Sequence, residues 1–324
     1  MKAALYDIKG GFSISKIGIP KFGSKELLIQ VKAAAINPVD YKLRTCDIPF
    51  LRWFMIHTVG RDFSGVVVDI GENITKFKIG DQVYGNASGG SLQEFTNVKE
   101  SEIGLKASNL SFLEAAGIGL ARETSLQSLK FWGEMNNKKI LIIWGSGGCG
   151  YIGIPIAKYF KANVTATCSE RNVNFVKEIG ADKIIDYTKS NFFGRFVDEE
   201  FDLIKTVTSA EDSNQEVIYR KFIKTDGKYV AINGYAGDWT RAFLYKTGIN
   251  CERNNYHLIL LEWKNEDLDL LKKISESGKL QTKYTNYQFD RFGVNEAFEK
   301  LMSKRTVRKL VIEIWLIIFI GINY

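Results

Sequence analysis

The chain has 324 residues, of which 45% are hydrophobic and 25% are charged. This composition is typical of soluble globular proteins, and the length is enough for two domains of ordinary size. The net charge of +7 is modest and is scattered along the chain, so we expect no nucleic-acid-binding surface. The densest basic segment, SKRTVRK at 303–309, is better explained as a solvated helix end.

The cysteine and histidine content argues against a zinc site and against a disulfide framework. Four cysteines form no close pair and two histidines have no ligand spacing: Cys46, Cys149, Cys168, Cys251, His57 and His257. Free thiols suit a reducing compartment, and the N-terminus carries no signal or transit pattern. We therefore expect a cytoplasmic protein without a metal site.

The first part of the chain, residues 1–105, predicts an all-β domain. Strands are expected at 27–36, 62–70 and 91–98, and FKIGDQVYG (77–85) is expected to form two strands around a Gly-Asp turn. Many short strands with turn residues at close intervals are typical of a β-barrel or sandwich.

Helical periodicity begins near Ser111, where Ser111 and Glu114 form the signature of a capping box. Strands and helices then alternate. Strands are expected at 139–144, 163–168, 182–187, 201–208 and 227–233, and helices at 150–160 and 171–180. This alternation predicts βαβ units and a doubly wound parallel sheet, so the fold class is α/β with a separate β-barrel domain.

The last part of the chain holds two expected helices, at 265–278 and 293–304, and a strand at 307–314. This segment is too small to fold alone and should pack back on the first domain. We therefore expect the β domain to comprise residues 1–118 completed by 257–314, and the α/β domain to comprise 119–256.

The chain ends in an apolar tail, WLIIFIGINY at 315–324. The apolar run from Ile314 to Ile320 is too short to span a bilayer, which needs about 20 residues. We expect no transmembrane segment and expect the tail to pack on its own domain or on a neighbouring subunit. A membrane-associated adaptor is an alternative that rests only on this tail.

A glycine-rich turn, WGSGGCG at 144–150, lies between an expected strand and an expected helix. Gly145, Gly147 and Gly150 fit the pattern G-x-G-x-x-G. The first glycine allows the tight turn, the second lets a pyrophosphate approach the backbone, and the third lets helix and strand pack closely. The turn therefore predicts a dinucleotide site.

The choice of dinucleotide depends on the end of the next strand, which reads TCSERN. An acid here would hold the ribose hydroxyls of NAD, and Glu170 lies near that position. Ser169 and Arg171 flank it, however, and a hydroxyl with a guanidinium suits the 2′-phosphate of NADPH. We therefore favour NADPH over NADH.

Several segments follow one another in the order found in medium-chain dehydrogenase/reductases: KAAAINPVDYKLR, VGRDFSGVVVDIG, FKIGDQVYG, GSLQEF, LEAAGIGLARET, GSGGCG, TCSERN and GADKIIDY. The chain most resembles the zinc-free quinone oxidoreductase (zeta-crystallin) and alkenal/one oxidoreductase branch. This resemblance implies a GroES-like catalytic domain, a Rossmann domain, an active site between them and a homodimer.

The resemblance also bears on zinc. The zinc enzymes of this superfamily have Gly-His-Glu where this chain has Gly60, Arg61 and Asp62, and the zinc cysteine expected near Asn37 is absent. Without a Lewis acid the substrate must accept hydride directly, as a quinone or an α,β-unsaturated carbonyl does. Arg61 and Asp62 then form a structural pair at the strand entrance, with a direct substrate role as the alternative.

The resemblance implies roles for individual residues in cofactor binding. The turn residues Gly147, Gly148, Cys149 and Gly150 would face the pyrophosphate, and Ser169, Arg171 and Tyr187 would surround the 2′-phosphate. Thr124 would contact the nicotinamide side. Lys309 would reach a cofactor phosphate, or alternatively would be a charge on an edge strand.

For catalysis the resemblance implies Asn37 in the active-site motif and Tyr41 as the nearest phenol, which could donate a proton or orient a carbonyl. The alternative for Tyr41 is a packing role. Lys205 and Thr208 depart from the family pattern beside the nicotinamide. They raise a second possibility for function, an NADPH-binding protein of the same fold with little or no turnover.

Overall fold

The computed structural model describes residues 1–6, 11–42, 59–131, 133–206, 213–233, 240, 242–244, 247, 255–280, 282–303, 306 and 308–314. The chain forms two compact units. The first comprises Met1–Leu120, Trp263–Glu276 and Gln281–Tyr324, and the second comprises Ala121–Glu262 and Ser277–Leu280.

The first unit is built on a seven-stranded sheet with the order β14-β15-β3-β4-β5-β7, in which β6 also pairs with β3. Its strands are β3 (Glu26–Ile36), β4 (Asp62–Ile70), β5 (Gln82–Asn86), β6 (Phe95–Lys99), β7 (Ile103–Leu105), β14 (Tyr284–Gln288) and β15 (Lys309–Glu313). A separate two-stranded sheet joins β1 (Lys2–Tyr6) to β2 (Phe12–Lys16). The strands predicted at 27–36 and 62–70 are confirmed.

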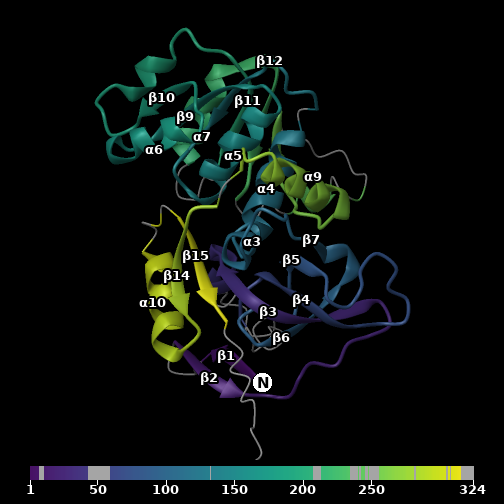
Figure 1. The fold of residues 1–324 in the computed structure, drawn as a ribbon. Coiled ribbons are helices and arrows are strands. Elements are labelled where there is room, and N and C mark those ends of the chain that lie inside the picture. The colour runs from purple at the N-terminus through teal and green to yellow at the C-terminus, as the bar shows by residue number, and fades with distance from the viewer. Residues whose placement is uncertain are drawn as a thin grey trace, which may run out of the picture. The chain divides into compact units, whose positions relative to one another are not determined.

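The final segment completes this sheet, because β15 pairs antiparallel with β3, which lies far away in the sequence. Figure 1 shows β14, β15 and helix α10 (Arg291–Met302) side by side. Asp290 caps α10 by accepting a hydrogen bond from Gly293 N, and Val294, Ala297, Phe298 and Leu301 recur at helical spacing on its buried face.

Two strand predictions in the first unit were wrong in part. In FKIGDQVYG only β5 forms, because a turn closes between Lys78 O and Asp81 N. In this turn Gly80 N donates to Val67 O, and Asp81 O accepts from Val67 N. The strand predicted at 91–98 begins only at Phe95, since Leu92 N bonds to Val59 O and Glu94 N bonds to Lys2 O. Backbone groups claimed by distant segments cannot extend the ladder that the local pattern suggests.

The predicted capping box opens α3 (Phe112–Ala116): Ser111 accepts from Glu114 N, and the Glu114 side chain accepts from Ser111 N. The helix ends at Gly117, and α4 (Gly119–Lys130) follows, so one predicted helix is two. Position 119 has no room for a side chain, because a Cβ there would lie 2.2 Å from Asp62 Oδ1. Elsewhere in this unit are α1 (Pro38–Lys42), η1 (Glu100–Glu102) and α9 (Asn265–Glu276).

The second unit is a six-stranded sheet with all its pairs parallel, as predicted. Its order is β10-β9-β8-β11-β12-β13, that is, 3-2-1-4-5-6 in chain order, the doubly wound arrangement. The strands are β8 (Lys139–Ile142), β9 (Asn163–Cys168), β10 (Lys183–Asp186), β11 (Phe201–Thr206), β12 (Ile223–Ala231) and β13 (Tyr256–Leu258). The boundary expected at residue 256 falls at the start of β13, so this unit continues to Glu262.

Helices connect the parallel strands of the second unit. They are α5 (Gly148–Tyr159), η2 (Glu170–Asn172), α6 (Val173–Glu178), η3 (Phe192–Phe196), α7 (Ser213–Tyr219) and η4 (Arg220–Phe222). In Figure 1 α5 and α6 lie close to the half of the sheet that contains β8, β9 and β10. This places the amino end of α5 directly after β8, the first strand of the sheet in chain order.

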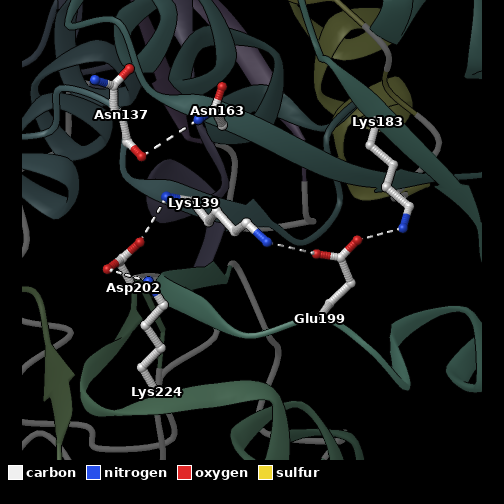
Figure 2. A network of polar contacts seen from close by, with 7 residues as sticks. All are labelled: Asn137, Lys139, Asn163, Lys183, Glu199, Asp202 and Lys224. Carbon is white, nitrogen blue, oxygen red and sulfur yellow. Dashed lines mark hydrogen bonds and ion pairs between the residues drawn. The ribbon is translucent and has the colours of Figure 1, made fainter.

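Charged side chains tie together the opposite edge of this sheet, where the parallel strands begin (Figure 2). Asp202 accepts from Lys139 N at 2.8 Å and from Lys224 Nζ at 3.0 Å, and Glu199 accepts from Lys183 Nζ at 2.6 Å. Ligands of doubly wound sheets bind at the carboxyl ends of the strands. This network is therefore structural, and each of its charges has an opposite charge nearby.

No helix within the described ranges is long and apolar enough to cross a membrane. The apolar tail, residues 315–324, lies outside the described residues, as do Cys46, His57, Thr208 and Cys251.

Candidate functional site

The glycine-rich turn connects β8 to α5 and has the geometry that a pyrophosphate requires. A Cβ at Gly150 would lie 2.1 Å from Trp144 O, so only glycine allows helix and strand to approach this closely. A Cβ at Gly145 would lie 3.0 Å from Ala166 Cβ, on the next strand. A Cβ at Gly148 would meet no heavy atom within 4 Å, so the backbone at the start of α5 is open. Gly147 is the N-cap.

Trp144 opens this turn in a left-handed conformation, with φ 63°, which is rare for a bulky residue. Its backbone N–H donates to Thr167 Oγ1 at 3.0 Å, and its ring centroid lies 4.8 Å from that of Tyr187. Tyr187 directly follows β10, so aromatic side chains from two strand ends meet here. Trp144 therefore lies at the carboxyl ends of the strands, where ligands of doubly wound sheets bind.

The end of β9 is joined to the turn by a residue that the sequence reasoning passed over. Asn172 Nδ2 donates to Ser146 Oγ at 3.0 Å and to Ser169 Oγ at 3.1 Å. Ser169 is buried and Arg171 is exposed. Asn172 stands in the TCSERN segment, but the residue type alone gave no signal of this bridge.

Glu170, the residue that would favour NAD, has an exposed side chain that is engaged in an ion pair. Its side chain is 70% exposed and its carboxylate pairs with Lys189 Nζ at 2.5 Å. The hydrogen bond and the charge of Glu170 raise the pKa of Lys189. Besides Asn172, the polar groups near the end of β9 include Ser169, Arg171 and half-buried Tyr187.

Lys205 lies in the interior of the second unit. It is fully buried on β11, and its Nζ donates to Cys149 O, in the first turn of α5, at 2.8 Å. Burial lowers the pKa of Lys205 to about 8, while the charge of Cys149 acts in the opposite direction. The Ser125 hydroxyl lies 2.9 Å from the same carbonyl oxygen and 2.7 Å from Ala121 O, and its one proton serves both. Thr124, its neighbour, is buried in α4, next to the equally buried Arg122 and Glu123.

A second cluster of polar side chains is buried in the first unit and centres on Asp62. One oxygen of Asp62 accepts from Lys309 Nζ at 2.9 Å and from Asn37 Nδ2 at 2.9 Å. The other accepts from Leu120 N at 2.6 Å. Lys309 Nζ also donates to Asn37 Oδ1 at 2.5 Å. Since Asp62 is fully buried, the cluster is a buried ion pair with its hydrogen bonds satisfied.

Asp40 adds a second carboxyl group to this cluster. Its Oδ2 accepts from Asn37 N at 2.6 Å, at the start of α1. Burial raises the pKa of Asp40 to about 7; the hydrogen bond from Asn37 opposes this, Asp62 adds to it, and Lys309 and Arg61 oppose it. Near neutral pH this carboxyl group is therefore divided between its protonated and ionised forms.

This cluster explains the Arg-Asp pair at the entrance of β4. The ion-pair partner of Asp62 is Lys309, whereas Arg61 is only partly buried and acts on Asp40 at longer range. Lys309 is not on an edge strand, because β15 lies between β14 and β3. Both ends of the Asn37 amide are engaged, and half-buried Tyr41 packs against the core of this unit.

Comparison with known proteins identifies the family. Residues 23–126 match the alcohol dehydrogenase GroES-like domain, and residues 179–312 match a family described as zinc-binding dehydrogenase. The 2-methylene-furan-3-one reductase of Solanum lycopersicum is 35% identical over 72% of this chain and 62% of that protein. The chloroplastic NADPH-dependent alkenal/one oxidoreductase of Arabidopsis thaliana is 36% identical over 72% of this chain and 63% of that protein.

The chain belongs to the medium-chain dehydrogenase/reductase superfamily, in its quinone oxidoreductase and alkenal/one oxidoreductase-like branch. This medium-chain dehydrogenase/reductase spans less than two thirds of the length of the two plant enzymes above. The quinone-oxidoreductase QR1 of Triphysaria versicolor is 28% identical over 97% of this chain and 98% of that protein.

Solved structures agree with this family and fold. The quinone oxidoreductase from Coxiella burnetii superposes with a TM-score of 0.83 at 26% identity, over 97% of this chain and 99% of that chain. CurK enoyl reductase, at 20% identity and a TM-score of 0.76, shows the fold alone. Although one matching family carries zinc in its description, no group of three His, Cys, Asp or Glu side chains suited to a metal is found in the part of the chain that the structure describes.

Proposed function

We propose that this chain is an NADPH-dependent reductase that transfers hydride to a quinone or an α,β-unsaturated carbonyl without a metal ion. The observation that carries the proposal is the turn from β8 to α5. Its closely packed Gly150 and open Gly148 backbone fit a pyrophosphate at the amino end of α5. Relatives named as quinone and alkenal/one oxidoreductases support the substrate class.

NADPH is favoured over NADH by the groups near the end of β9. Ser169 and Arg171 offer a hydroxyl and an exposed guanidinium, which suit a phosphate. Glu170, which would hold free ribose hydroxyls, is paired with Lys189. One relative is itself named as NADPH-dependent.

When bound, NADPH supplies the hydride. A quinone or conjugated carbonyl accepts that hydride at an electron-poor carbon and then takes a proton at oxygen or at the neighbouring carbon. Asn37 has one amide N–H beyond its bond to Asp62, and Lys309 and Asp62 hold that amide in one orientation. We assign Asn37 and Tyr41 the orientation of the substrate carbonyl, with the phenol or water as the proton source.

The alternative, a cofactor-binding protein without turnover, rests on Lys205 and Thr208 beside the nicotinamide. Lys205 is buried and donates to Cys149 O in the first turn of α5, whereas Thr208 lies outside the described residues, so the alternative is an outcome of the test below.

The test is NADPH oxidation, followed by absorbance, with an enone, an enal and a small quinone. Substrate-dependent oxidation is the expected result. Binding of NADPH without oxidation by any of the three would favour the non-enzymatic reading, and no binding would refute both.

Gly148→Glu is a variant that tests the proposed cofactor site in the same assay. Its side chain enters open space, and an acid at the first turn of a helix is favourable, so the variant should keep its melting temperature. Its carboxylate would lie where the pyrophosphate is proposed to bind, so NADPH binding and oxidation should both be lost. Full activity in this variant would refute the proposed cofactor site.

A further inference from the structure

Lys205 is an unusual residue for the centre of a parallel sheet. It lies on β11 between β8 and β12, where its strand neighbours are the apolar Ile142 and Val230. Its side chain is fully buried, and lysine is almost never fully buried unless it is paired. Burial of an isolated ammonium group costs free energy unless an opposite charge or hydrogen bonds compensate for the lost water.

No carboxylate of the described residues forms an ion pair with Lys205; its hydrogen bond goes to the carbonyl of Cys149. The pKa of Lys205 is lowered to about 8 by burial, so the group is still mainly cationic near neutral pH. Among the described groups packed around it, the titratable one that acts on it is Cys149, on α5. The described part of the chain therefore gives this buried positive charge a carbonyl partner but no carboxylate.

The surroundings of the ammonium group are shaped to keep it under α5. A Cβ at Gly153, one turn along α5, would lie 2.5 Å from Lys205 Nζ, so a glycine there leaves room for the lysine. The Ser125 hydroxyl lies 2.9 Å from the same Cys149 carbonyl oxygen and 2.7 Å from Ala121 O, so its single proton is shared between two uncharged acceptors. The charge is thus held against the first turn of the helix whose amino end carries the open Gly148 backbone.

We infer that Lys205 is a positioning residue for the dinucleotide, whose pyrophosphate supplies the negative charge that the buried ammonium lacks. The inference rests on the proposed function and concerns cofactor affinity, not a chemical step. A buried cation adds to the positive potential at the amino end of α5, where the helix dipole and free N–H groups already favour anions. Because both NADPH and NADH carry a pyrophosphate, the effect should be the same for both.

The test is calorimetric titration of NADPH and NADH into wild type, Lys205→Met, Lys205→Gln and Ser125→Ala. Lys205→Met should weaken binding of both cofactors by on the order of tenfold. Ser125→Ala removes a donor to the same carbonyl without removing charge, so it should change either affinity by less than about twofold. Lys205→Gln provides a polar, neutral variant in case the methionine disturbs packing.

Thermal melting separates this role from a purely structural one. Loss of an unpaired buried cation should leave the melting temperature of Lys205→Met unchanged or raise it, whereas a structural lysine would lower it. Wild-type affinity for NADH should also fall between about pH 7 and about pH 9 as Lys205 loses its proton, and this fall should be absent from Lys205→Met.

Wild-type affinity for both cofactors in Lys205→Met and Lys205→Gln would overturn the inference and leave the proposed function intact. Equal weakening by Ser125→Ala would also overturn it, because the carbonyl contact and not the charge would then matter. Absence of binding to wild type would refute the proposed function, and the inference with it.

Discussion

Among the residues that the structure describes, Lys205 and Lys309 are the two buried lysines, and their surroundings differ. Lys309, on β15 of the first unit, donates to Asp62 and Asn37, and its charge is compensated inside the protein. Lys205, on β11 of the second unit, donates to a backbone carbonyl, and its pKa is lowered to about 8 by burial. A compensated cation stabilises the local structure, whereas an uncompensated one is ready to receive an anion.

The same contrast between compensated and uncompensated charge is found between the amino ends and the carboxyl ends of the strands of the parallel sheet. At the edge where the strands begin, Asp202 and Glu199 each bind more than one lysine (Figure 2). At the carboxyl edge, the glycine-rich turn presents open backbone and Lys205 lies beneath it. Ion pairs lie at the amino ends of the parallel strands. The buried charge of Lys205 lies near their carboxyl ends, where we propose that the cofactor binds.

Removal of the partner of Lys309 should have the largest effect on stability. Asp62→Ala leaves a buried cation without a carboxylate and also removes the acceptor of Asn37 and Leu120 N. We expect a loss of about 3–5 kcal/mol in the free energy of unfolding, measured by urea denaturation. Asp182→Asn, in an exposed pair with Lys158, is the control and should lose no more than about 1 kcal/mol. Similar losses in both would mean that burial of the pair has no special weight.

The pH dependence of stability should have opposite signs at the two clusters. The pKa of Asp40 is raised from 3.8 to about 7, so the folded chain holds that proton more tightly, and its contribution to stability falls as pH rises through this range. The pKa of Lys205 is lowered from 10.5 to about 8, so its contribution rises with pH between these values.

Urea midpoints across pH for wild type, Asp40→Asn and Lys205→Met measure the two contributions. Asp40→Asn should lose the fall of stability with pH below about pH 7 and keep the rise above about pH 8. Lys205→Met should lose that rise and keep the fall. A slope that is the same in wild type and in the corresponding variant would contradict the environment described for that residue.

An exposed cation at the proposed cofactor site should behave differently from buried Lys205. Arg171→Ala should weaken NADPH binding by roughly 1.5–3 kcal/mol, the value of a charged hydrogen bond, and leave NADH binding unchanged. Calorimetry with both cofactors measures this directly. Equal weakening of NADH would show that Arg171 does not read the 2′-phosphate.

The glycine-rich turn offers a comparison between a closed and an open glycine. Gly150→Ala places a Cβ 2.1 Å from Trp144 O, so we expect a loss of about 1–3 kcal/mol in stability and a loss of NADPH binding. Gly148→Ala enters open space and should change stability by less than about 0.5 kcal/mol. Chemical denaturation of both variants tests the turn geometry, which would be contradicted by equal stability.

The smallest expected effect is that of a chelator. Reductase activity should be unchanged by EDTA, because the proposed reaction needs no Lewis acid. Elemental analysis should find no stoichiometric zinc in the purified protein. Loss of activity in EDTA that zinc restores would contradict the metal-free proposal.

The sequence predicted the parts of this molecule that depend on local pattern. The parallel strands, the capping box at Ser111 and the glycine-rich turn each follow from residues close together in the chain. The Lys309–Asp62 pair was missed because its members are 247 positions apart, and only the pairing of β15 with β3 beside β4 brings them together.

Side-chain direction was the second limit of the sequence. Lys205 was correctly placed on a strand, but which face it takes depends on the register of β11 with β8 and β12. The bridge from Asn172 to Ser146 likewise depends on how the turn after β8 folds against the end of β9. Such contacts are set by tertiary packing and carry no local signal.

The contrast between the two buried lysines can be tested in one thermal-melting experiment, with wild type, Lys309→Met and Lys205→Met, each with and without NADPH. A ligand that binds only the folded state raises the melting temperature, and at a fixed ligand concentration the rise is larger the tighter the binding. We predict that Lys309→Met melts well below wild type but keeps the NADPH-induced rise, whereas Lys205→Met melts no lower than wild type and loses most of that rise. The reverse pattern, with the rise lost in Lys309→Met and kept in Lys205→Met, would contradict the account.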